Sequence, residues 1–231
     1  MPTAIITGAS RGLGLALART LAQRQWSLVI DARGAGDLEH AAQELAQLTE
    51  VVAIPGDVAD ERHLRALVSA AGADVDLLVN NASVLGPSPQ PSLSTYPLET
   101  LRHVYEVNVL APLALAQLVL PRMPDGAKLI NVTSDAAVEP YKGWGGYGSS
   151  KAALEQLTAI LAAETPDIGI YALDPGDMRT QLHQEASPEE DISDRPPPEE
   201  SVPGLLALID GELPSGRYRA AELIAAGEAR A

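Results

Sequence analysis

The sequence of 231 residues contains no cysteine and no phenylalanine. Without cysteine there are no disulfides, thiolate metal sites, iron–sulfur clusters or cysteine nucleophiles, and a reducing cytoplasm is the favoured compartment. The four histidines are scattered, with no pair at i and i+4, so we predict no metal site. These absences exclude cysteine-based and zinc-based chemistry from the candidate functions.

Basic residues are also scarce, since 16 Lys and Arg stand against 31 Asp and Glu, for a formal charge of −15. That charge repels nucleic acids and anionic lipid surfaces. The longest apolar stretch, Val109–Leu120, is interrupted by Pro112 and Gln117 and is shorter than the ~20 residues of a membrane span. A strand-like run begins two residues after Met1, which leaves no room for a signal peptide. We therefore expect a soluble cytoplasmic protein with no nucleic-acid or membrane partner.

The remaining composition, 46% hydrophobic, fits one α/β domain spanning residues 1–231. Short β-rich runs alternate with Ala- and Leu-rich segments of helical period, and the runs are apolar without alternation, as in a parallel sheet covered on both faces. Strands are expected at Thr3–Thr7, Ser27–Asp31, Val51–Pro55, Val75–Val79, Ala127–Val132, Ile168–Leu173 and Gly216–Arg219. Helices are expected at Leu15–Gln25, Leu38–Leu48, Glu61–Ala71, Leu98–Met123, Tyr147–Glu164 and Val202–Asp210. This order predicts a doubly wound sheet of about seven strands.

A glycine-rich turn connects the first expected strand to the first expected helix, with the sequence Thr7-Gly8-Ala9-Ser10-Arg11-Gly12-Leu13-Gly14. Glycines allow a tight turn and a close approach of the backbone to a pyrophosphate, and a helix N-terminus supplies free N–H groups and positive potential. We interpret the turn as a phosphate site, and the alternative is a tight turn without a ligand.

A second motif is Tyr147-Gly148-Ser149-Ser150-Lys151, and none of the other five tyrosines has a lysine four residues later. Positions i and i+4 share one face of a helix, so the Lys151 ammonium can approach the Tyr147 phenol. A cation about 4 Å away favours phenolate by about 4 kcal/mol, which brings the phenol pKa from near 10 toward neutrality. We expect Tyr147 to act as a general acid and base, and the alternative is an exposed tyrosine beside a solvated lysine.

With these two motifs the chain resembles the short-chain dehydrogenase/reductase superfamily, in its single-domain branch with a Rossmann-type fold. The resemblance covers most of the chain. It implies a serine thirteen positions before the tyrosine, which is Ser134, where a hydroxyl can polarise a carbonyl. It also implies that Asn108 holds a water near Lys151, although an asparagine that bonds backbone at a helix kink is the alternative.

The same resemblance implies a nicotinamide dinucleotide cofactor and an oxidoreductase that interconverts a carbonyl and a secondary alcohol. The residues it places on the cofactor are Gly8, Ser10, Arg11, Gly12, Leu13, Gly14, Arg33, Asp57, Val58, Asn81, Ala82, Tyr147, Lys151, Pro175, Gly176, Met178 and Thr180. Ser83 departs from the family pattern, which has glycine there, and adds a small side chain where the backbone passes the cofactor.

We expect NADP(H) to be preferred over NAD(H). An acid about 20 residues past the glycines usually selects NAD, and Asp31 satisfies that rule. The family's NAD-selecting acid, however, falls on Ala32 here, and Asp31 lies one position earlier on the opposite side of the strand. Arg33 matches the position of an NADP-binding arginine, and Arg11 adds a second guanidinium for the 2′-phosphate.

Residues 185–200 form an acidic, proline-rich segment with seven acids and four prolines. The segment follows the expected nicotinamide-binding residues, where the superfamily has a flap over the substrate, so we predict a flexible lid that disfavours anionic substrates. The alternative is a solvated loop with no role in catalysis.

Two other functions compete with the oxidoreductase. A catalytically idle dinucleotide-binding regulator can use the same fold, and an epimerase or dehydratase of the extended branch would need more than the 55 residues that follow Gly176. Apolar helix faces, and the pairing of these helices in the family, predict a homodimer or homotetramer. No residue pattern specifies the carbonyl substrate.

Overall fold

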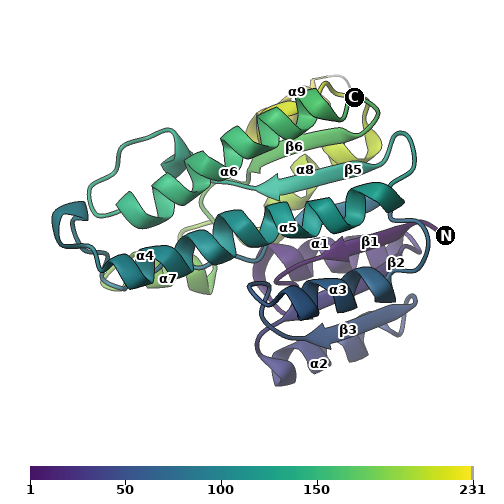
Figure 1. Cartoon of the computed structure of the whole chain (residues 1–231), viewed down its shortest axis with the longest axis horizontal. Helices are drawn as coiled ribbons and strands as arrows, with labels where there is room; N and C mark the ends of the chain where they lie inside the picture. Colours follow the sequence, from purple (N-terminus) through teal and green to yellow (C-terminus); the bar gives the residue numbers. More distant parts are fainter. Residues whose placement is uncertain (230–231) are drawn as a thin grey trace.

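A computed structural model of the chain describes residues 1–229, which form one parallel β-sheet between two layers of helices (Figure 1). The sheet has the strand order β3-β2-β1-β4-β5-β6-β7, and each neighbouring pair is parallel. The strands in this part of the chain are β1 (Thr3–Ile6), β2 (Ser27–Ala32), β3 (Val51–Pro55), β4 (Leu77–Asn80), β5 (Lys128–Val132), β6 (Gly169–Asp174) and β7 (Gly216–Arg219). The predicted doubly wound α/β fold is confirmed.

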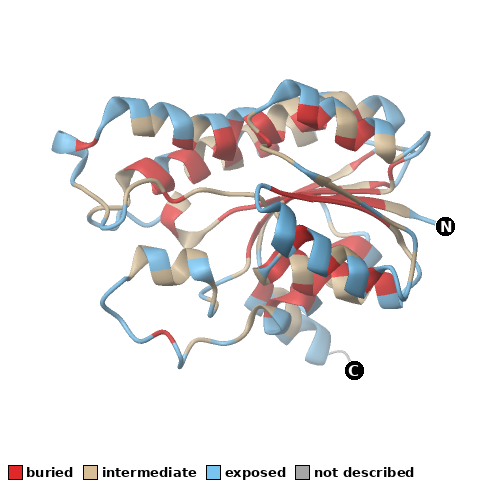
Figure 2. Cartoon of the chain, turned by 90° about the horizontal axis from the view of Figure 1, so that it is seen from below, coloured by how far each residue is buried: buried red, intermediate tan, exposed pale blue. Residues whose placement is uncertain are grey.

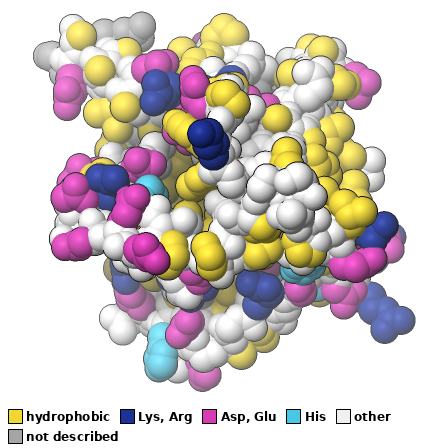
Figure 3. All heavy atoms as spheres, turned by 90° about the vertical axis from the view of Figure 1, so that its left-hand side faces the viewer, with side chains coloured by type: hydrophobic (Ala, Val, Ile, Leu, Met, Phe, Trp, Pro, Cys, Tyr) yellow, Lys and Arg dark blue, Asp and Glu magenta, His cyan; other side chains and the backbone are white. Residues whose placement is uncertain are grey.

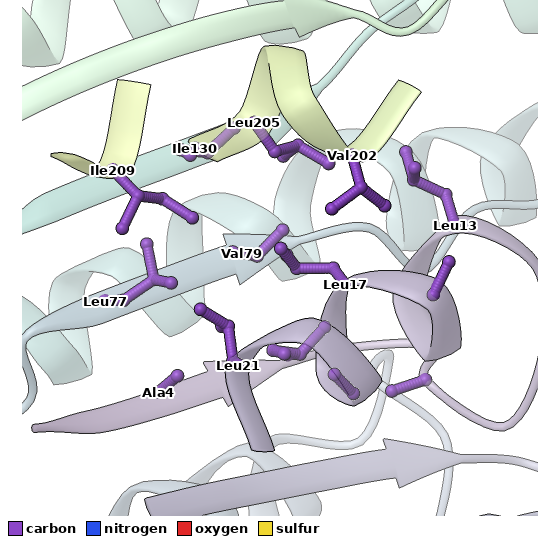
Figure 4. Packing of buried hydrophobic residues seen from close by; sticks show 14 of the residues in the cluster. Ala4, Leu13, Leu17, Leu21, Leu77, Val79, Ile130, Val202, Leu205 and Ile209 are labelled. Atoms are coloured by element: carbon purple, nitrogen blue, oxygen red, sulfur yellow. The ribbon is translucent and has the colours of Figure 1, made fainter. Parts of the chain in front are cut away.

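Helices cover both faces of the sheet, and the apolar strands are buried between them (Figure 2). Within residues 1–229 the α-helices are α1 (Gly12–Gln23), α2 (Ala35–Leu45), α3 (Glu61–Ala70), α4 (Leu98–Tyr105), α5 (Ala111–Val119), α6 (Gly145–Glu164), α7 (Gln181–Ala186), α8 (Val202–Asp210) and α9 (Ala220–Glu228). On one face, Leu17 and Leu21 of α1 pack with Val202 and Leu205 of α8 against β1, β4 and β5 (Figure 4). On the other face, α3, α5 and α6 pack against the same sheet.

The expected boundaries agree with the observed ones to within a few residues, with two exceptions. The sequence analysis did not predict α7 and α9, which are short and carry few buried residues. The helix expected at Leu98–Met123 is present, but a π-helical turn at Glu106–Leu110 separates α4 from α5. That turn contains Asn108, whose side chain bonds elsewhere, as described below.

The helical stretch Leu98–Arg122 is long and apolar enough to cross a membrane by length and composition. In this fold, half of its most apolar window is buried. Val107, Leu115 and Val119 belong to the core on the α3 side of the sheet. We therefore interpret this stretch as a core helix.

Because the strands are parallel, their carboxyl ends meet at one edge of the sheet, on the left of Figure 1. The glycine turn after β1 and the segments that follow β2, β4, β5 and β6 all lie at this edge. In open α/β sheets this edge is where ligands bind.

Candidate active site

A cleft of about 1190 Å³ lies along the carboxyl edge of the sheet. It extends from the loops after β2 and β3, past the glycine turn, to the start of α6 and to α7. The predicted site residues that line it are Gly8, Ser10, Arg11, Gly12, Leu13, Arg33, Asp57, Val58, Asn81, Ala82, Ser134, Tyr147, Lys151, Pro175, Gly176, Met178 and Thr180. Two predicted residues, Gly14 and Asn108, lie behind its wall.

The glycine turn has the backbone geometry of a phosphate site. Gly8 and Gly12 have φ values of +67° and +59°, which side chains rarely adopt. Behind the turn, a Cβ on Gly14 would stand 2.6 Å from the carbonyl oxygen of Gly8, so only glycine lets α1 pack this closely. The first turn of α1 has no acidic residue, and no side chain caps it. Free N–H groups and the helix dipole therefore face the cleft, which fits the pyrophosphate of a dinucleotide.

Asp31 is occupied by two protein donors. Its Oδ1 accepts a hydrogen bond from the Gly8 N–H at 2.7 Å, and its Oδ2 lies 2.8 Å from His63 Nε2. Both side chains are almost fully buried. The carboxylate therefore supports the glycine turn, and the choice between NADP(H) and NAD(H) stays a prediction. Arg33, two residues later, is exposed at the cleft.

The segment after β4 is fixed to the glycine turn. The Thr7 hydroxyl accepts hydrogen bonds from the N–H groups of Asn81 and Ala82, both at 3.0 Å. Asn81 Nδ2 donates to the carbonyl oxygens of Thr7 and Gly8. These contacts hold the two loops as one surface of the cleft.

Tyr147 and Lys151 lie one turn apart on α6, and both are buried. Lys151 Nζ stands 5.5 Å from the centroid of the Tyr147 ring and donates to the carbonyl oxygen of Val132 at 2.8 Å. Gly148 allows α6 to pack closely on the segment at Ala136, because a Cβ there would meet the Ala136 carbonyl oxygen at 2.5 Å. The helical face predicted from the spacing of four is therefore directed into the cleft.

The phenol pKa differs from our expectation. Burial raises the pKa of Tyr147 well above its usual range, the hydroxyls of Ser83 and Ser134 lower it, and the carboxylates of Asp135 and Asp174 raise it. Burial also lowers the pKa of Lys151 to about 8, against a smaller opposing effect of Glu155. The expected lowering toward neutrality was wrong for this structure, because burial has the largest effect on the phenol and Lys151 donates to the Val132 carbonyl. A neutral phenol beside an ammonium is suited to donating a proton.

Ser134 follows β5 and reaches the cleft beside Tyr147, as the spacing of thirteen predicted. Its hydroxyl donates to Asp135 Oδ1 at 3.0 Å and accepts from the Ala136 N–H at 3.2 Å. The neighbouring Thr133 donates instead to Glu155 at 2.7 Å, so its hydroxyl is already committed. Thr133 is also buried, whereas Ser134 is partly exposed at the cleft, so Ser134 is the hydroxyl of this pair that a ligand can reach.

Asn108 is fully buried in the π-helical turn. Its Oδ1 accepts from the Val84 N–H at 2.9 Å and from Ser83 Oγ at 3.1 Å, and its Nδ2 donates to the Val84 carbonyl at 2.9 Å and to Ser150 Oγ at 3.0 Å. This is the backbone-bonding alternative for Asn108, and it positions the segment after β4 against α6. A role in holding water near Lys151 stays a prediction.

Several cleft residues were not predicted. They are Ser83 beside the Tyr147 phenol, Asp135, Trp144, Asp174 and Leu182. Asp174 Oδ2 lies 3.2 Å from Arg217 of β7, which also bonds Glu155 at 2.9 Å and the Ser134 carbonyl at 3.4 Å. Asp135 and Asp174 could have been predicted as cleft residues, because each lies at or shortly after the carboxyl end of a strand. Arg217, the partner of Asp174, could not, because it comes from a strand distant in sequence.

Residues 185–200 pack more than their composition indicated. Ile192 is buried, and the Arg179 N–H donates to the Pro196 carbonyl at 2.8 Å. The seven acids are exposed, and Glu185, Ala186 and Pro198 line the cleft. The segment therefore borders the site, and its movement as a lid stays a prediction.

Comparisons with known proteins identify the family. A family model described as short chain dehydrogenase matches residues 2–191. Sepiapterin reductase of Bos taurus is 32% identical over 197 residues, which cover 78% of this chain and 74% of that protein. Sulfoacetaldehyde reductase 2 of Chromohalobacter salexigens is 33% identical over 186 residues, which cover 77% of this chain and 73% of that one.

A solved structure is similar over nearly the whole chain. The alcohol dehydrogenase of Thermococcus sibiricus, complexed with 5-hydroxy-NADP, has a TM-score of 0.84 and 28% identity, and the match covers 95% of each chain. The curated relatives are named reductases and dehydrogenases that act on carbonyl and alcohol groups. The matched family model, these relatives and the sheet with its glycine turn together show that this chain is an oxidoreductase of the short chain dehydrogenase family, acting on CH–OH and C=O groups.

Proposed function

We propose that this enzyme interconverts a carbonyl and a secondary alcohol with NADP(H), and that Tyr147 transfers the proton. The observation that carries the proposal is the meeting of Ser134, Tyr147 and Lys151 in one cleft with the glycine turn. The relatives named as reductases, and the similar alcohol dehydrogenase with a bound NADP analogue, support it.

In this proposal the dinucleotide lies along the cleft. The N-terminus of α1 holds the pyrophosphate, Arg11 and Arg33 bind the 2′-phosphate, and Asp57 and Val58 contact the adenine. Pro175, Gly176, Met178 and Thr180 line the nicotinamide end. When bound, the cofactor supplies or accepts the hydride, and the protein supplies position and electrostatics.

The proton chemistry belongs to the side chains. The hydroxyls of Ser134 and Tyr147 donate hydrogen bonds to the substrate carbonyl oxygen and polarise it. Tyr147 then gives its proton to the developing alkoxide, and the Lys151 ammonium beside the ring stabilises the phenolate that remains. In the oxidative direction the same groups act in reverse.

A catalytically idle dinucleotide-binding regulator is the alternative that this fold allows. The test is NADPH oxidation across a panel of aldehydes and ketones, with NADPH binding measured separately by fluorescence. We expect turnover of at least one carbonyl class. Binding of NADPH without any turnover would favour the regulator.

The cofactor preference is tested at Arg33. We expect wild-type kcat/KM to be higher with NADPH than with NADH, and Arg33→Ser to lower it for NADPH by about tenfold to a hundredfold, because a charge-assisted contact to phosphate is lost. The value for NADH should change little. Arg62→Ser is the matched control, since Arg62 is exposed and lies outside the cleft. A wild-type preference for NADH would contradict the proposal.

Self-association is proposed for the helices that flank the cleft. Leu110, between α4 and α5, and Ile160 of α6 are 49% and 44% exposed although both are large and apolar. A second copy that covers these faces would bury them. Light scattering at micromolar concentration should give the mass of a dimer or tetramer, and the mass of a monomer would contradict this assembly.

A further inference from the structure

The substrate side of the cleft contains a carboxylate next to the catalytic hydroxyl. Asp135 follows Ser134 directly, lines the cleft and is partly exposed. Its Oδ1 accepts from Ser134 Oγ at 3.0 Å, and its Oδ2 accepts from Tyr141 Oη at 2.8 Å. Both donors are neutral, so Asp135 keeps its net negative charge at the wall of the cleft.

Two other acids that line the cleft, Asp174 and Asp177, already have cationic partners. Asp174 is paired with Arg217 and Arg219, and Asp177 with Arg195. Within residues 1–229 Asp135 forms no ion pair, and Lys142, next to Tyr141 in sequence, is exposed and forms none. Of these three carboxylates, Asp135 is therefore the one without a cationic partner among the described residues.

That charge opposes the proposed chemistry when the site is empty. The Asp135 carboxylate raises the pKa of the Tyr147 phenol, in addition to the larger effect of burial. A positive group bound at Asp135 would cancel this effect and stabilise the phenolate that forms when Tyr147 gives up its proton. The same group would favour negative charge on the carbonyl oxygen.

An aromatic ring completes the surroundings of Asp135. Trp144 lines the cleft, with its ring centroid 5.8 Å from that of Tyr147 and 6.1 Å from that of Tyr141. Indole is the best side chain for cation–π contacts. Val84, Leu85 and Leu182 add an apolar wall for the uncharged body of a substrate.

The acidic residues around the cleft also favour a cationic ligand. Figure 3 views this end of the molecule and shows acidic, basic and hydrophobic side chains beside one another. The segment 185–200 contributes seven exposed acids, and the chain has a formal charge of −15. Such a field attracts cations and repels anions.

We propose that the carbonyl substrate of this site carries a cationic nitrogen, an ammonium or amidinium group close to the carbonyl, and that Asp135 binds it. The inference rests on the proposed function and names its substrate class. In the complex, Asp135 is the ionic partner and Trp144 packs against the same positive group. Asp135 thereby becomes a specificity-determining residue of the reduction.

The test compares Asp135→Asn, which keeps an acceptor oxygen for Ser134, with wild type on three aryl ketones. The probes are phenacylammonium, its neutral isostere propiophenone, and the anion benzoylformate. Asp135→Asn should lower the ratio of kcat/KM for phenacylammonium to that for propiophenone by about tenfold. The ratio for benzoylformate to propiophenone should rise. A folding defect would lower all three values together and leave both ratios unchanged, so unchanged ratios in a folded variant overturn the inference.

A binding measurement separates this inference from the proposed function. Phenethylammonium has no carbonyl, and calorimetry on the NADPH-saturated enzyme should show it binding about tenfold more weakly to Asp135→Asn than to wild type. Glu139→Gln is the matched control, because Glu139 is an exposed carboxylate nearby that does not line the cleft. Equal affinities for wild type and Asp135→Asn would overturn the inference even if ketones are reduced, whereas a lack of turnover with intact discrimination would count against the proposed function alone.

Discussion

Replacing Tyr147 with phenylalanine is expected to lower kcat for carbonyl reduction by about a hundredfold to ten-thousandfold, the range associated with loss of a general acid. The phenol is buried between Ser83, Ser134 and Lys151, and burial keeps its pKa high, so it holds a proton throughout the neutral range. Phenylalanine retains the ring and its packing against Trp144 but has no hydroxyl and cannot donate a proton. The measurement is kcat under saturating NADPH with a ketone that the wild type turns over.

Binding and folding controls make the Tyr147 result specific. NADPH affinity, measured by fluorescence, should remain within about twofold, because the ring and Lys151 are unchanged. Tyr105→Phe is the matched control, since Tyr105 lies outside the cleft and carries the same loss of a hydroxyl. A Tyr147→Phe enzyme that retains more than about a tenth of wild-type kcat would assign the proton transfer to another group.

Most of the fold could be predicted from the sequence because the five central strands are apolar runs buried on both faces, whereas β3 and β7 are more exposed. Val51–Pro55 and Gly216–Arg219 have the expected boundaries, since turn residues or a short connection enclose each run. The helix α7 was not predicted, because six residues with no fully buried side chain give no apolar period. The π-helical turn at Glu106–Leu110 was also invisible to periodicity, and within it Asn108 forms tertiary bonds to Val84 and Ser150.

The candidate site could be predicted where local spacing alone places a side chain. Tyr147 and Lys151 share a helical face, and Gly8 and Gly12 adopt the positive φ values that the turn requires. The pairing of Asp31 with His63 could not be predicted, because it joins β2 to α3. The phenol pKa was predicted with the wrong sign, because a spacing of four gives proximity but not burial or the direction of the Lys151 ammonium.

Replacing Lys151 with methionine is expected to lower kcat/KM for reduction by about a hundredfold or more. The ammonium stands 5.5 Å from the Tyr147 ring centroid, beside the phenolate that must form. Lys151 is also one of the residues that the family resemblance places on the cofactor, and we propose that it holds the nicotinamide ribose, so NADPH affinity should fall as well, unlike in Tyr147→Phe. Methionine fills the buried site and removes a buried charge, so the thermal transition should stay close to wild type. An unchanged NADPH affinity would remove the ribose contact from the mechanism.

The direction in which kcat/KM changes with pH identifies Lys151 as the titrating group. Burial lowers the pKa of Lys151 to about 8, so the side chain is charged below that pH and loses its charge as the pH rises through it. The Tyr147 phenol stays protonated over the same interval because its pKa is raised. Wild-type kcat/KM for reduction, which reports the free enzyme, should therefore decline above about pH 8. Lys151→Arg keeps a positive charge at every accessible pH, so its lower activity should show no decline near pH 8. A decline at the same pH in Lys151→Arg would assign the titration to a different group.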